Sequence, residues 1–384
     1  MQIAIINITG GGMSGGYRKY LCNVLPRMAR HDDVETILCA TPEPIGVSDW
    51  FDLMPNVRFA SCKPFRFLFP HRDVALLREL ERFSPDVIFV PVERNFRFNR
   101  VPVVNMIQNM EPFAKNVDGN PVGERFREWA QYVDGRRAIR NADGIIAISK
   151  FVSDFLETQW KIPAEKIGLV YHGIDPCRNG DCKRPHVILK DWEGRILFTA
   201  GSIRPARGLE DLLQAMKHLS LHGEKSVRLV VAGESGHSMA GYQKKLKDWA
   251  QENKLSDRIC WAGSLNEEEM AWCYQKCSAF VMTSRVESFG MIAGEAMAHG
   301  CICISADNPC LPELFGDAAI YYPPKDGQAL AEVIKTVLAW DDNQRKTMSE
   351  KAKKRATEFS WDVCAEKTVA ALVKAVESRQ SAKL

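Results

Sequence analysis

The chain has 384 residues, which is too long for one typical domain and comfortable for two domains of nearly equal size. Its 51 basic and 48 acidic residues leave a formal net charge of +3, so the overall charge does not indicate a nucleic-acid partner. The twelve cysteines are scattered, which suits a reducing compartment, and no apolar run is long enough to span a bilayer. We expect a globular, cytoplasmic protein.

The chain opens with an apolar run, Gln2 to Ile8, that predicts a buried parallel strand and not a signal peptide. The glycine-rich sequence GGGMSGG follows at residues 10–16, and a helix is predicted from there to about residue 30. A strand, a glycine-rich turn and a helix are the opening of a doubly wound α/β domain. The glycines lack G-x-G-x-x-G spacing, so they do not indicate a dinucleotide cofactor, and a flexible turn is the alternative.

Further apolar runs in the first half predict strands that alternate with helices, at residues 36–40, 87–91, 101–107, 144–148 and 167–170. Gln108 and Asn109 follow the strand at 101–107, at the carboxyl edge where α/β sheets place ligands. An amide can position a substrate, but it cannot take up a proton at neutral pH.

The segment KPFRFLFPHR, residues 63–72, interleaves basic and aromatic side chains. Such a segment can rest on an anionic membrane surface, although a packed loop explains the pattern equally well. We keep peripheral membrane contact as a hypothesis.

Residues 176–193 are rich in Pro, Gly, Asn, Asp and Lys, which predicts an interdomain linker. The predicted organisation is therefore a domain at 1–175, this linker, a domain at 194–360 and a terminal helix at 361–384. Cys177 and Cys182 have the spacing nearest to a metal site, but no second Cys or His pair lies at zinc-finger distance from them, so we expect no metal.

The second domain begins with a predicted strand at 195–200 and a loop that carries Arg204 and Arg207. Two cations between a strand and a helix can clamp a diphosphate, although loop arginines are also commonly solvated. The predicted strands at 227–232 and 259–262 end in small-residue turns, which contain Gly233, Ser264 and Leu265.

A third loop, RVESFGMIAGEAMAHG at residues 285–300, follows a predicted strand and leads into a helix near Gly290. The unpaired N–H groups of a helix start favour an anion such as a diphosphate. Glu287 and Glu295 border this point, with Phe289 and Met291 beside the glycine, and carboxylates accept hydrogen bonds from the hydroxyls of sugars. The pattern predicts a nucleotide-sugar site, and two solvated glutamates on an ordinary helix are the alternative.

The sequence TSRVESFGM, together with the following EAMAHG, resembles the E-x7-E signature of retaining glycosyltransferases of family 4 (group 1). The resemblance implies the GT-B architecture, two Rossmann-like domains facing across a cleft, with the terminal helix packing back on the first domain. It also implies that Glu287 contacts the transferred sugar and Glu295 the ribose. By the same resemblance, Gly15 and Gly16 lie near the donor diphosphate, and Gly233, Ser264 and Leu265 line the base.

The chain departs from the family pattern at two places. Many members have a histidine where Gln108 or Asn109 stands, so these amides are assigned a positioning role at the donor sugar. In the phosphate loop Arg204 stands in for an arginine that usually follows the first glycine, and Arg207 replaces a lysine, which keeps the charge but changes its geometry.

The resemblance implies transfer of a sugar, with retention, from a nucleotide-diphosphate donor to a hydroxyl of a glycan or lipid-linked acceptor. A cell-surface polysaccharide or lipopolysaccharide pathway is expected. The chain contains no D-x-D sequence, so we expect the arginines to replace a metal ion, and we expect no cofactor.

Two alternatives stay open at this point. A nucleotide-sugar epimerase or a phosphorylase of the same fold would need acid–base groups, and His172 is the only histidine in the motifs. A non-catalytic partner subunit would keep the fold without transfer, and the intact Glu287, Gly290 and Glu295 argue against it.

Overall fold

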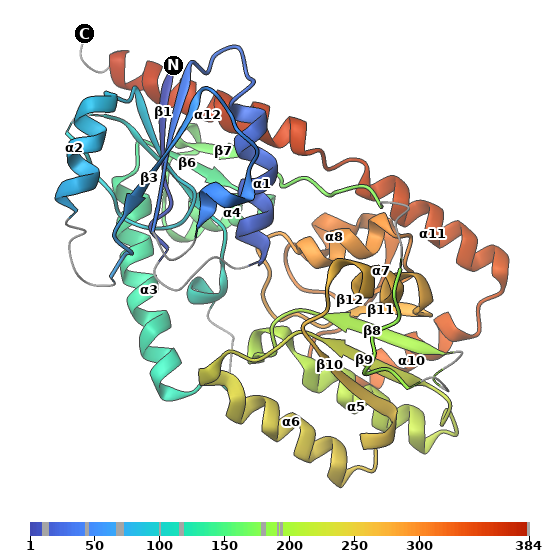
Figure 1. The fold of residues 1–384 in the computed structure, drawn as a ribbon. Helices are drawn as coiled ribbons and strands as arrows, with labels where there is room; N and C mark the ends of the chain where they lie inside the picture. Colours follow the sequence, from blue (N-terminus) through green and yellow to red (C-terminus); the bar gives the residue numbers. More distant parts are fainter. Residues whose placement is uncertain are drawn as a thin grey trace. The chain divides into compact units, whose positions relative to one another are not determined.

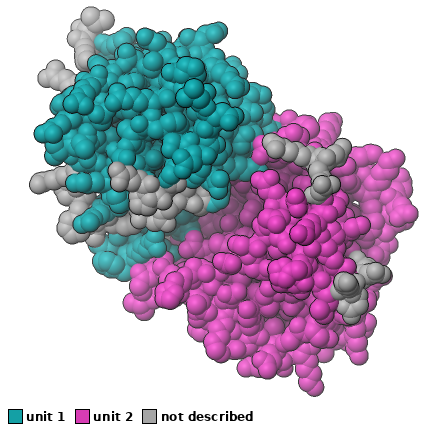
Figure 2. Space-filling model, viewed as in Figure 1, with its two compact units in different colours: residues 1–113, 126–173, 359–384 teal, residues 114–125, 174–358 magenta. Residues whose placement is uncertain are grey.

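The computed structural model describes residues 1–9, 15–42, 46–66, 73–99, 101–114, 119–177, 182–189, 192 and 195–381. The chain divides into two compact units, drawn in teal and magenta in Figure 2. Unit 1 comprises residues 1–113, 126–173 and 359–384, and unit 2 comprises residues 114–125 and 174–358.

Unit 1 is built on a parallel sheet with the strand order β3-β2-β1-β4-β5-β6-β7 (Figure 1). The order reverses between β1 and β4, which pair with Ile3 opposite Val87, and such a switch point is where doubly wound sheets place ligands. The strands are β1 (Gln2–Ile6), β2 (Thr36–Pro42), β3 (Val57–Cys62), β4 (Val87–Val90), β5 (Val103–Ile107), β6 (Gly144–Ala147) and β7 (Ile167–Leu169).

The helices of unit 1 start at recognisable capping residues in two cases. Asp73 caps α2 by accepting a hydrogen bond from the Leu76 amide, and Ser149 caps α4 by accepting one from Val152. The helices are α1 (Gly15–Met28), α2 (Val74–Phe83), α3 (Val122–Asn141, whose first four residues are grouped with unit 2), α4 (Lys150–Gln159) and α12 (Trp361–Ser381).

Helix α12 comes from the end of the chain and packs on unit 1, beside α1 and over β4 to β7 (Figure 1). Small residues allow this approach: a Cβ atom on Gly173 would lie 2.4 Å from the Trp361 ring, and one on Gly168 would touch Ala371 at 3.5 Å. Arg27 forms an ion pair with Asp362 near the start of the helix.

Unit 2 is built on a second parallel sheet, with the order β10-β9-β8-β11-β12-β13 and a switch point between β8 and β11. The strands are β8 (Ile196–Ala200), β9 (Arg228–Ala232), β10 (Ile259–Gly263), β11 (Ala279–Met282), β12 (Cys303–Ala306) and β13 (Ala319–Tyr322). The two doubly wound sheets confirm the predicted α/β fold class.

The helices of unit 2 bury apolar faces against this sheet, in a core that includes Leu212 of α5 and Ile334 of α10. Asn266 and Asp341 start α7 and α11 with capping boxes. The helices are α5 (Leu209–Leu221), α6 (Ala240–Glu252), α7 (Glu267–Lys276), α8 (Met291–Ala298), α9 (Leu311–Phe315), α10 (Gly327–Leu338) and α11 (Asp342–Ala356).

Candidate active site

Three loops meet at the carboxyl ends of β8, β9 and β10 because glycine lets their backbones approach closely. The Gly201 amide donates to the carbonyl of Ala232 at 3.0 Å, and the Gly233 amide donates to the carbonyl of Gly263 at 2.7 Å. Gly233 has φ 115°, and a Cβ atom there would lie 2.0 Å from the Gly201 carbonyl oxygen. The adjoining Ser264 is exposed. The structure thus brings the loop that holds Gly233 against the loop that holds Ser264 and Leu265.

The loop that carries the two arginines follows β8 and is tied to the loop that follows β11. Arg204 precedes a 3-10 turn, Pro205–Arg207. The Thr283 hydroxyl donates to the carbonyl of Arg207 at 2.6 Å, and the Arg285 amide donates to the carbonyl of Ala206 at 2.7 Å. These bonds hold the arginines at the same edge of the sheet as the acidic loop.

A buried ion pair also joins the loop that follows β11 to helix α5, which begins directly after the arginine loop. Arg285 donates to both carboxylate oxygens of Asp211 at 2.5 Å, and Asp211 is 1% exposed. The Tyr322 hydroxyl and the Lys325 amide donate to the same carboxylate at 3.1 and 3.0 Å. Satisfying a buried carboxylate this fully is what makes its burial tolerable. Neither Asp211 nor Arg285 was predicted, although Arg285 stands inside the TSRVESFGM sequence.

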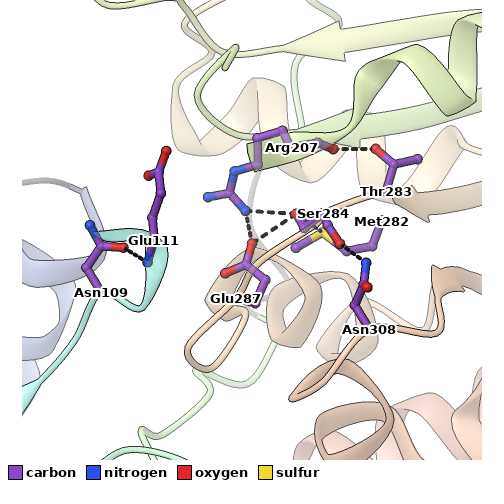
Figure 3. A network of polar contacts seen from close by, with 8 residues as sticks. All are labelled: Asn109, Glu111, Arg207, Met282, Thr283, Ser284, Glu287 and Asn308. Carbon is purple, nitrogen blue, oxygen red and sulfur yellow. Dashed lines mark hydrogen bonds and ion pairs between the residues drawn. The ribbon is translucent and has the colours of Figure 1, made fainter. Parts of the chain in front are cut away.

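Arg207 and Glu287 point toward one another at the centre of this edge (Figure 3). The guanidinium of Arg207 donates to Glu287 Oε1 and, at 3.2 Å, to Ser284 Oγ. The Ser284 hydroxyl donates to Glu287 Oε1 at 3.0 Å, and Asn308 donates to the Ser284 carbonyl at 2.6 Å. The ion pair is partly shielded from water, with side-chain exposures of 24% for Arg207 and 12% for Glu287.

A hollow of about 10 Å³ lies beside this ion pair, at the carboxyl ends of β8 and β11. Its lining includes Gly201, Ser202, Arg207, Thr283 and Ser284. It has about the room that one water molecule needs. The side chains therefore largely fill this part of the sheet edge.

Helix α8 begins at Met291, directly after Gly290, which confirms the predicted start near Gly290. Gly290 precedes the helix with φ 90°, and a Cβ atom there would lie 3.1 Å from Leu314. The amides of Met291 and the next residues start the helix and have no partner within it, so this end favours an anion. The Phe289 side chain is buried, which leaves its backbone as the part that can face a ligand.

Glu295 lies one turn into α8 and is held by a tyrosine that the sequence analysis did not single out. The Tyr274 hydroxyl donates to Glu295 Oε2 at 3.1 Å. Tyr274 is buried, and its ring stacks on His299 with centroids 4.9 Å apart. Burial, with Glu295 nearby, raises the pKa of Tyr274 well above its ordinary value, so the phenol keeps its proton and acts as a donor.

The remaining predicted residues lie in unit 1. Gln108 donates to the carbonyl of Pro91 at 3.0 Å. The Asn109 side chain accepts from the Glu111 amide at 3.0 Å (Figure 3). Both amides thus make local bonds just after β5. Gly15 and Gly16 open α1, and residues 10–14 of the glycine-rich loop lie outside the described residues.

His172 is a core residue of unit 1 and not a candidate acid or base. Its ring lies 4.9 Å from Tyr20 and stacks on Trp361 at 5.9 Å between centroids. Burial lowers its pKa to about 3, so the imidazole is neutral at physiological pH.

The described residues also bear on metal binding and on membrane spans. No group of three or more His, Cys, Asp and Glu side chains in the described ranges could hold a metal ion. Within the same ranges, every helix is too short or too polar to cross a bilayer. Of the basic and aromatic segment at 63–72, residues 67–72 lie outside the described part, and Phe65 is buried beneath Arg94.

Two family models match the chain. A model described as "Glycosyl transferases group 1" matches residues 184–355, and a model described as "Glycosyltransferase Family 4" matches residues 14–178. Together the two matches extend over most of the chain.

The chain also resembles curated proteins. It is 27% identical over 178 residues to the O-antigen chain mannosyltransferase B of Escherichia coli, a match that covers 46% of this chain and 45% of the relative. It is 29% identical over 237 residues to the lipopolysaccharide 1,2-N-acetylglucosaminetransferase of Salmonella typhimurium, covering 58% of this chain and 60% of the relative. The chain thus spans about half the length of these relatives.

Solved structures share the fold. The crystal structure of Anabaena HepE in complex with UDP and glucose has a TM-score of 0.72 and 19% identity, and covers 97% of this chain and 99% of that one. The crystal structure of WaaG, a glycosyltransferase involved in lipopolysaccharide biosynthesis, has a TM-score of 0.66 and 13% identity, with coverage of 97% and 99%. These likenesses confirm the predicted architecture of two Rossmann-like domains.

Proposed function

The chain belongs to the family 4 (group 1) glycosyltransferases, which have the GT-B fold, and we propose that it transfers a sugar from a nucleotide diphosphate to a hydroxyl of a glycan or lipid-linked acceptor. Relatives named for O-antigen and lipopolysaccharide synthesis support a role in building a cell-surface polysaccharide. The observation that carries the proposal is the grouping of Arg207, Glu287, Gly290 and Glu295 around one sheet edge in unit 2.

Each group at this edge has a distinct task in the proposal. The start of α8 and the guanidinium groups of Arg204 and Arg207 hold the diphosphate. Glu287 accepts hydrogen bonds from the hydroxyls of the transferred sugar, and Glu295 accepts them from the ribose. The base lies on the backbone of the loops at Gly233, Ser264 and Leu265, and Gln108 and Asn109 act as positioning residues.

The proposed chemistry retains the anomeric configuration. The bond from the anomeric carbon to the diphosphate oxygen breaks while the acceptor oxygen bonds to the same face, and the acceptor proton passes to the departing diphosphate. Ionic and hydrogen-bonded contacts already engage Glu287 with Arg207 and Ser284, which supports a role at the sugar hydroxyls and not as a covalent nucleophile.

We propose that the reaction needs no metal ion and no cofactor. Arg204 and Arg207 supply the positive charge that a divalent ion otherwise brings to a leaving diphosphate. Arg207 lies at the centre of the sheet edge, where its guanidinium can stabilise the negative charge that develops on the leaving diphosphate.

The first alternative, an epimerase or a phosphorylase of the same fold, loses support from the environment of His172. This histidine is buried among aromatic rings, and its lowered pKa keeps it neutral. The second alternative, a partner subunit without transfer activity, is an outcome of the experiment below.

We also propose that the protein works in the cytoplasm with α3 resting on an anionic membrane surface. Phe126, Trp129 and Val133 follow one another at helical spacing and are 63%, 53% and 37% exposed. Exposed Arg137 and Arg140 continue the same face toward the helix end, so apolar and cationic groups are ordered as an anionic headgroup layer requires. All twelve cysteines are free thiols, which supports a reducing compartment.

Liposome co-sedimentation tests the membrane contact. We expect wild-type protein to sediment with anionic vesicles and Trp129→Glu to stay in the supernatant. Leu53→Glu, which alters another exposed apolar residue, is the matched control. Equal sedimentation of all three proteins contradicts the contact.

A donor panel tests the proposed activity. UDP-, GDP- and ADP-sugars are offered to wild-type protein and to Glu295→Ala, and binding is followed by calorimetry and turnover by nucleotide release. We expect one nucleotide to bind and the variant to lose it. Absence of binding across the panel contradicts the transferase proposal, and binding without any turnover favours the partner subunit.

A further inference from the structure

We propose that the ion pair between Arg207 and Glu287 makes the donor site select the intact nucleotide-sugar over the bare nucleoside diphosphate. The inference rests on the proposed function, in which Arg207 serves the diphosphate and Glu287 serves the sugar. The new element is that Arg207 and Glu287 bind each other until a ligand with both a diphosphate and a sugar replaces the ion pair.

The geometry of the site carries the first step. One guanidinium nitrogen of Arg207 donates both to Glu287 Oε1 and to Ser284 Oγ, and Ser284 donates to the same carboxylate oxygen (Figure 3). Gly201 makes room for this arrangement, because a Cβ atom there would lie 3.3 Å from Nε of Arg207. The orientation of Arg207 toward Glu287 is therefore favoured by the neighbouring Ser284 and Gly201 as well as by charge.

Charge balance carries the second step. A bare diphosphate that draws Arg207 away leaves Glu287 with the Ser284 hydroxyl and brings a second anion near it. The Glu287 side chain is 12% exposed, so water compensates the lost cation poorly. Removing one partner of a shielded ion pair is costly because the remaining charge is left unpaired.

The intact donor avoids this cost. Its diphosphate replaces the carboxylate at Arg207, and its sugar hydroxyls donate to Glu287 in place of the guanidinium. Both charges keep partners, so the sugar part strengthens binding of the diphosphate part. Sugar and diphosphate thus bind cooperatively through one ion pair.

The same exchange favours release of the product. Transfer removes the sugar hydroxyls from Glu287 while the nucleoside diphosphate still occupies Arg207. Arg207 can then return to the carboxylate, which weakens its hold on the leaving product. The ion pair thus distinguishes the nucleotide-sugar from the nucleoside diphosphate, and this distinction does not depend on contacts with the nucleotide base.

Glu287→Gln tests the exchange, because the amide keeps the size of the side chain and removes its charge. Calorimetry measures the dissociation constants of the nucleoside diphosphate and of the nucleotide-sugar identified by the donor panel. We expect the variant to bind the nucleoside diphosphate about five to ten times more tightly than wild type, since Arg207 is no longer held by a carboxylate. We expect its binding of the nucleotide-sugar to improve less or to weaken.

Glu295→Gln is the matched control. It is assigned to the ribose, which donor and product share, so it should weaken both ligands by the same factor. Unchanged or weaker nucleoside diphosphate binding by Glu287→Gln overturns the inference. Glu287→Ala is a second variant with the same expected direction.

The wild-type protein gives an independent measurement that needs no variant. It should bind the intact donor more tightly than the nucleoside diphosphate, and equal or reversed affinities contradict the exchange. Failure of wild-type protein to bind either ligand is a different result, because it overturns the proposed function itself.

Discussion

At the scale of single residues, some side chains shape the site although the proposal gives them no contact with a substrate. Tyr274 is the clearest case, because its hydroxyl donates to one oxygen of Glu295 at 3.1 Å. A phenol with a raised pKa keeps its proton, so it can donate to the carboxylate and hold it in one orientation. Tyr274 is therefore a positioning residue for Glu295, the residue proposed to bind the ribose.

Replacing Tyr274 by Phe removes the hydroxyl and keeps the ring that stacks on His299. We expect the nucleotide to bind about three to ten times more weakly, which is the typical net worth of one hydrogen bond. The affinity for a 2′,3′-dideoxynucleotide should fall much less, because this ligand has no ribose hydroxyl to donate to Glu295. Calorimetry with both nucleotides measures the difference.

The control for that substitution is Tyr321→Phe, which removes a hydroxyl that donates to the Gly316 carbonyl on another part of the sheet. It should leave both affinities unchanged. An equal loss for the normal and the dideoxynucleotide in Tyr274→Phe contradicts the positioning role, because it indicates a general loss of structure.

His172 affects stability and not chemistry. Its pKa falls from an ordinary 6.5 to about 3 on folding, so between these values the unfolded chain binds a proton that the folded chain does not. The free energy of unfolding therefore falls as the pH drops below about 6.5, by about 2 kcal/mol by pH 5 for this one group. His172→Gln should remove that part of the acid sensitivity.

Urea unfolding at about pH 7 and about pH 5 measures the effect in wild type and variant. His222→Gln, which alters an exposed histidine at the end of α5, should keep the wild-type pH dependence. If His172→Gln loses as much stability on acidification as wild type does, protonation of His172 is not a cause of the acid sensitivity.

At the scale of elements, the loops after the strands depend on glycine conformations. Gly233→Ala places a Cβ atom 2.0 Å from the Gly201 carbonyl oxygen at a φ of 115°, so the two loops must separate. We expect a loss of about 2 to 4 kcal/mol in the free energy of unfolding and weaker nucleotide binding.

Gly236→Ala is the matched control in the same loop, because a Cβ atom there meets nothing within 4 Å and φ is −59°. It should leave stability within about 0.5 kcal/mol of wild type or raise it slightly. Denaturant unfolding compares the two variants, and equal stability would show that the close approach of the loops is not needed.

Most strands were predictable because a doubly wound sheet buries both faces of its strands, which makes them continuous apolar runs. β3 was not predicted, because only Cys62 is buried in Val57–Cys62 and an edge strand lacks that signal. α3 was missed too, since its exposed face carries Phe126 and Trp129, which obscures the usual amphipathic pattern.

At the scale of the whole molecule, the predicted motif residues of the donor site share one sheet edge because parallel strands end on the same side. The resemblance assigned Arg207, Gly233 and Glu287 to one donor site, and this rule explains why they lie together. It could not supply Asp211 with Arg285, or Tyr274 with Glu295, because such pairs depend on strand order and on which way side chains point. The proposed exchange of partners at Arg207 likewise could not be predicted from the sequence, because it depends on the contact between Arg207 and Glu287.

The two units also differ in how well their functional residues could be predicted from the sequence. In unit 2 the predicted Arg207, Glu287 and Glu295 each contact another side chain of the site. In unit 1 the predicted Gln108 and Asn109 make only local bonds among those found for them, with Pro91 and Glu111.

The most direct test follows the sugar itself. Wild-type protein is incubated with the bound nucleotide-sugar and a lipid-linked glycan, and nuclear magnetic resonance identifies the new glycosidic bond. The account predicts one added sugar with the anomeric configuration of the donor and one nucleoside diphosphate released for each bond, also in the presence of a metal chelator. A tightly bound donor whose sugar never reaches an acceptor, or reaches it with inverted configuration, would contradict it.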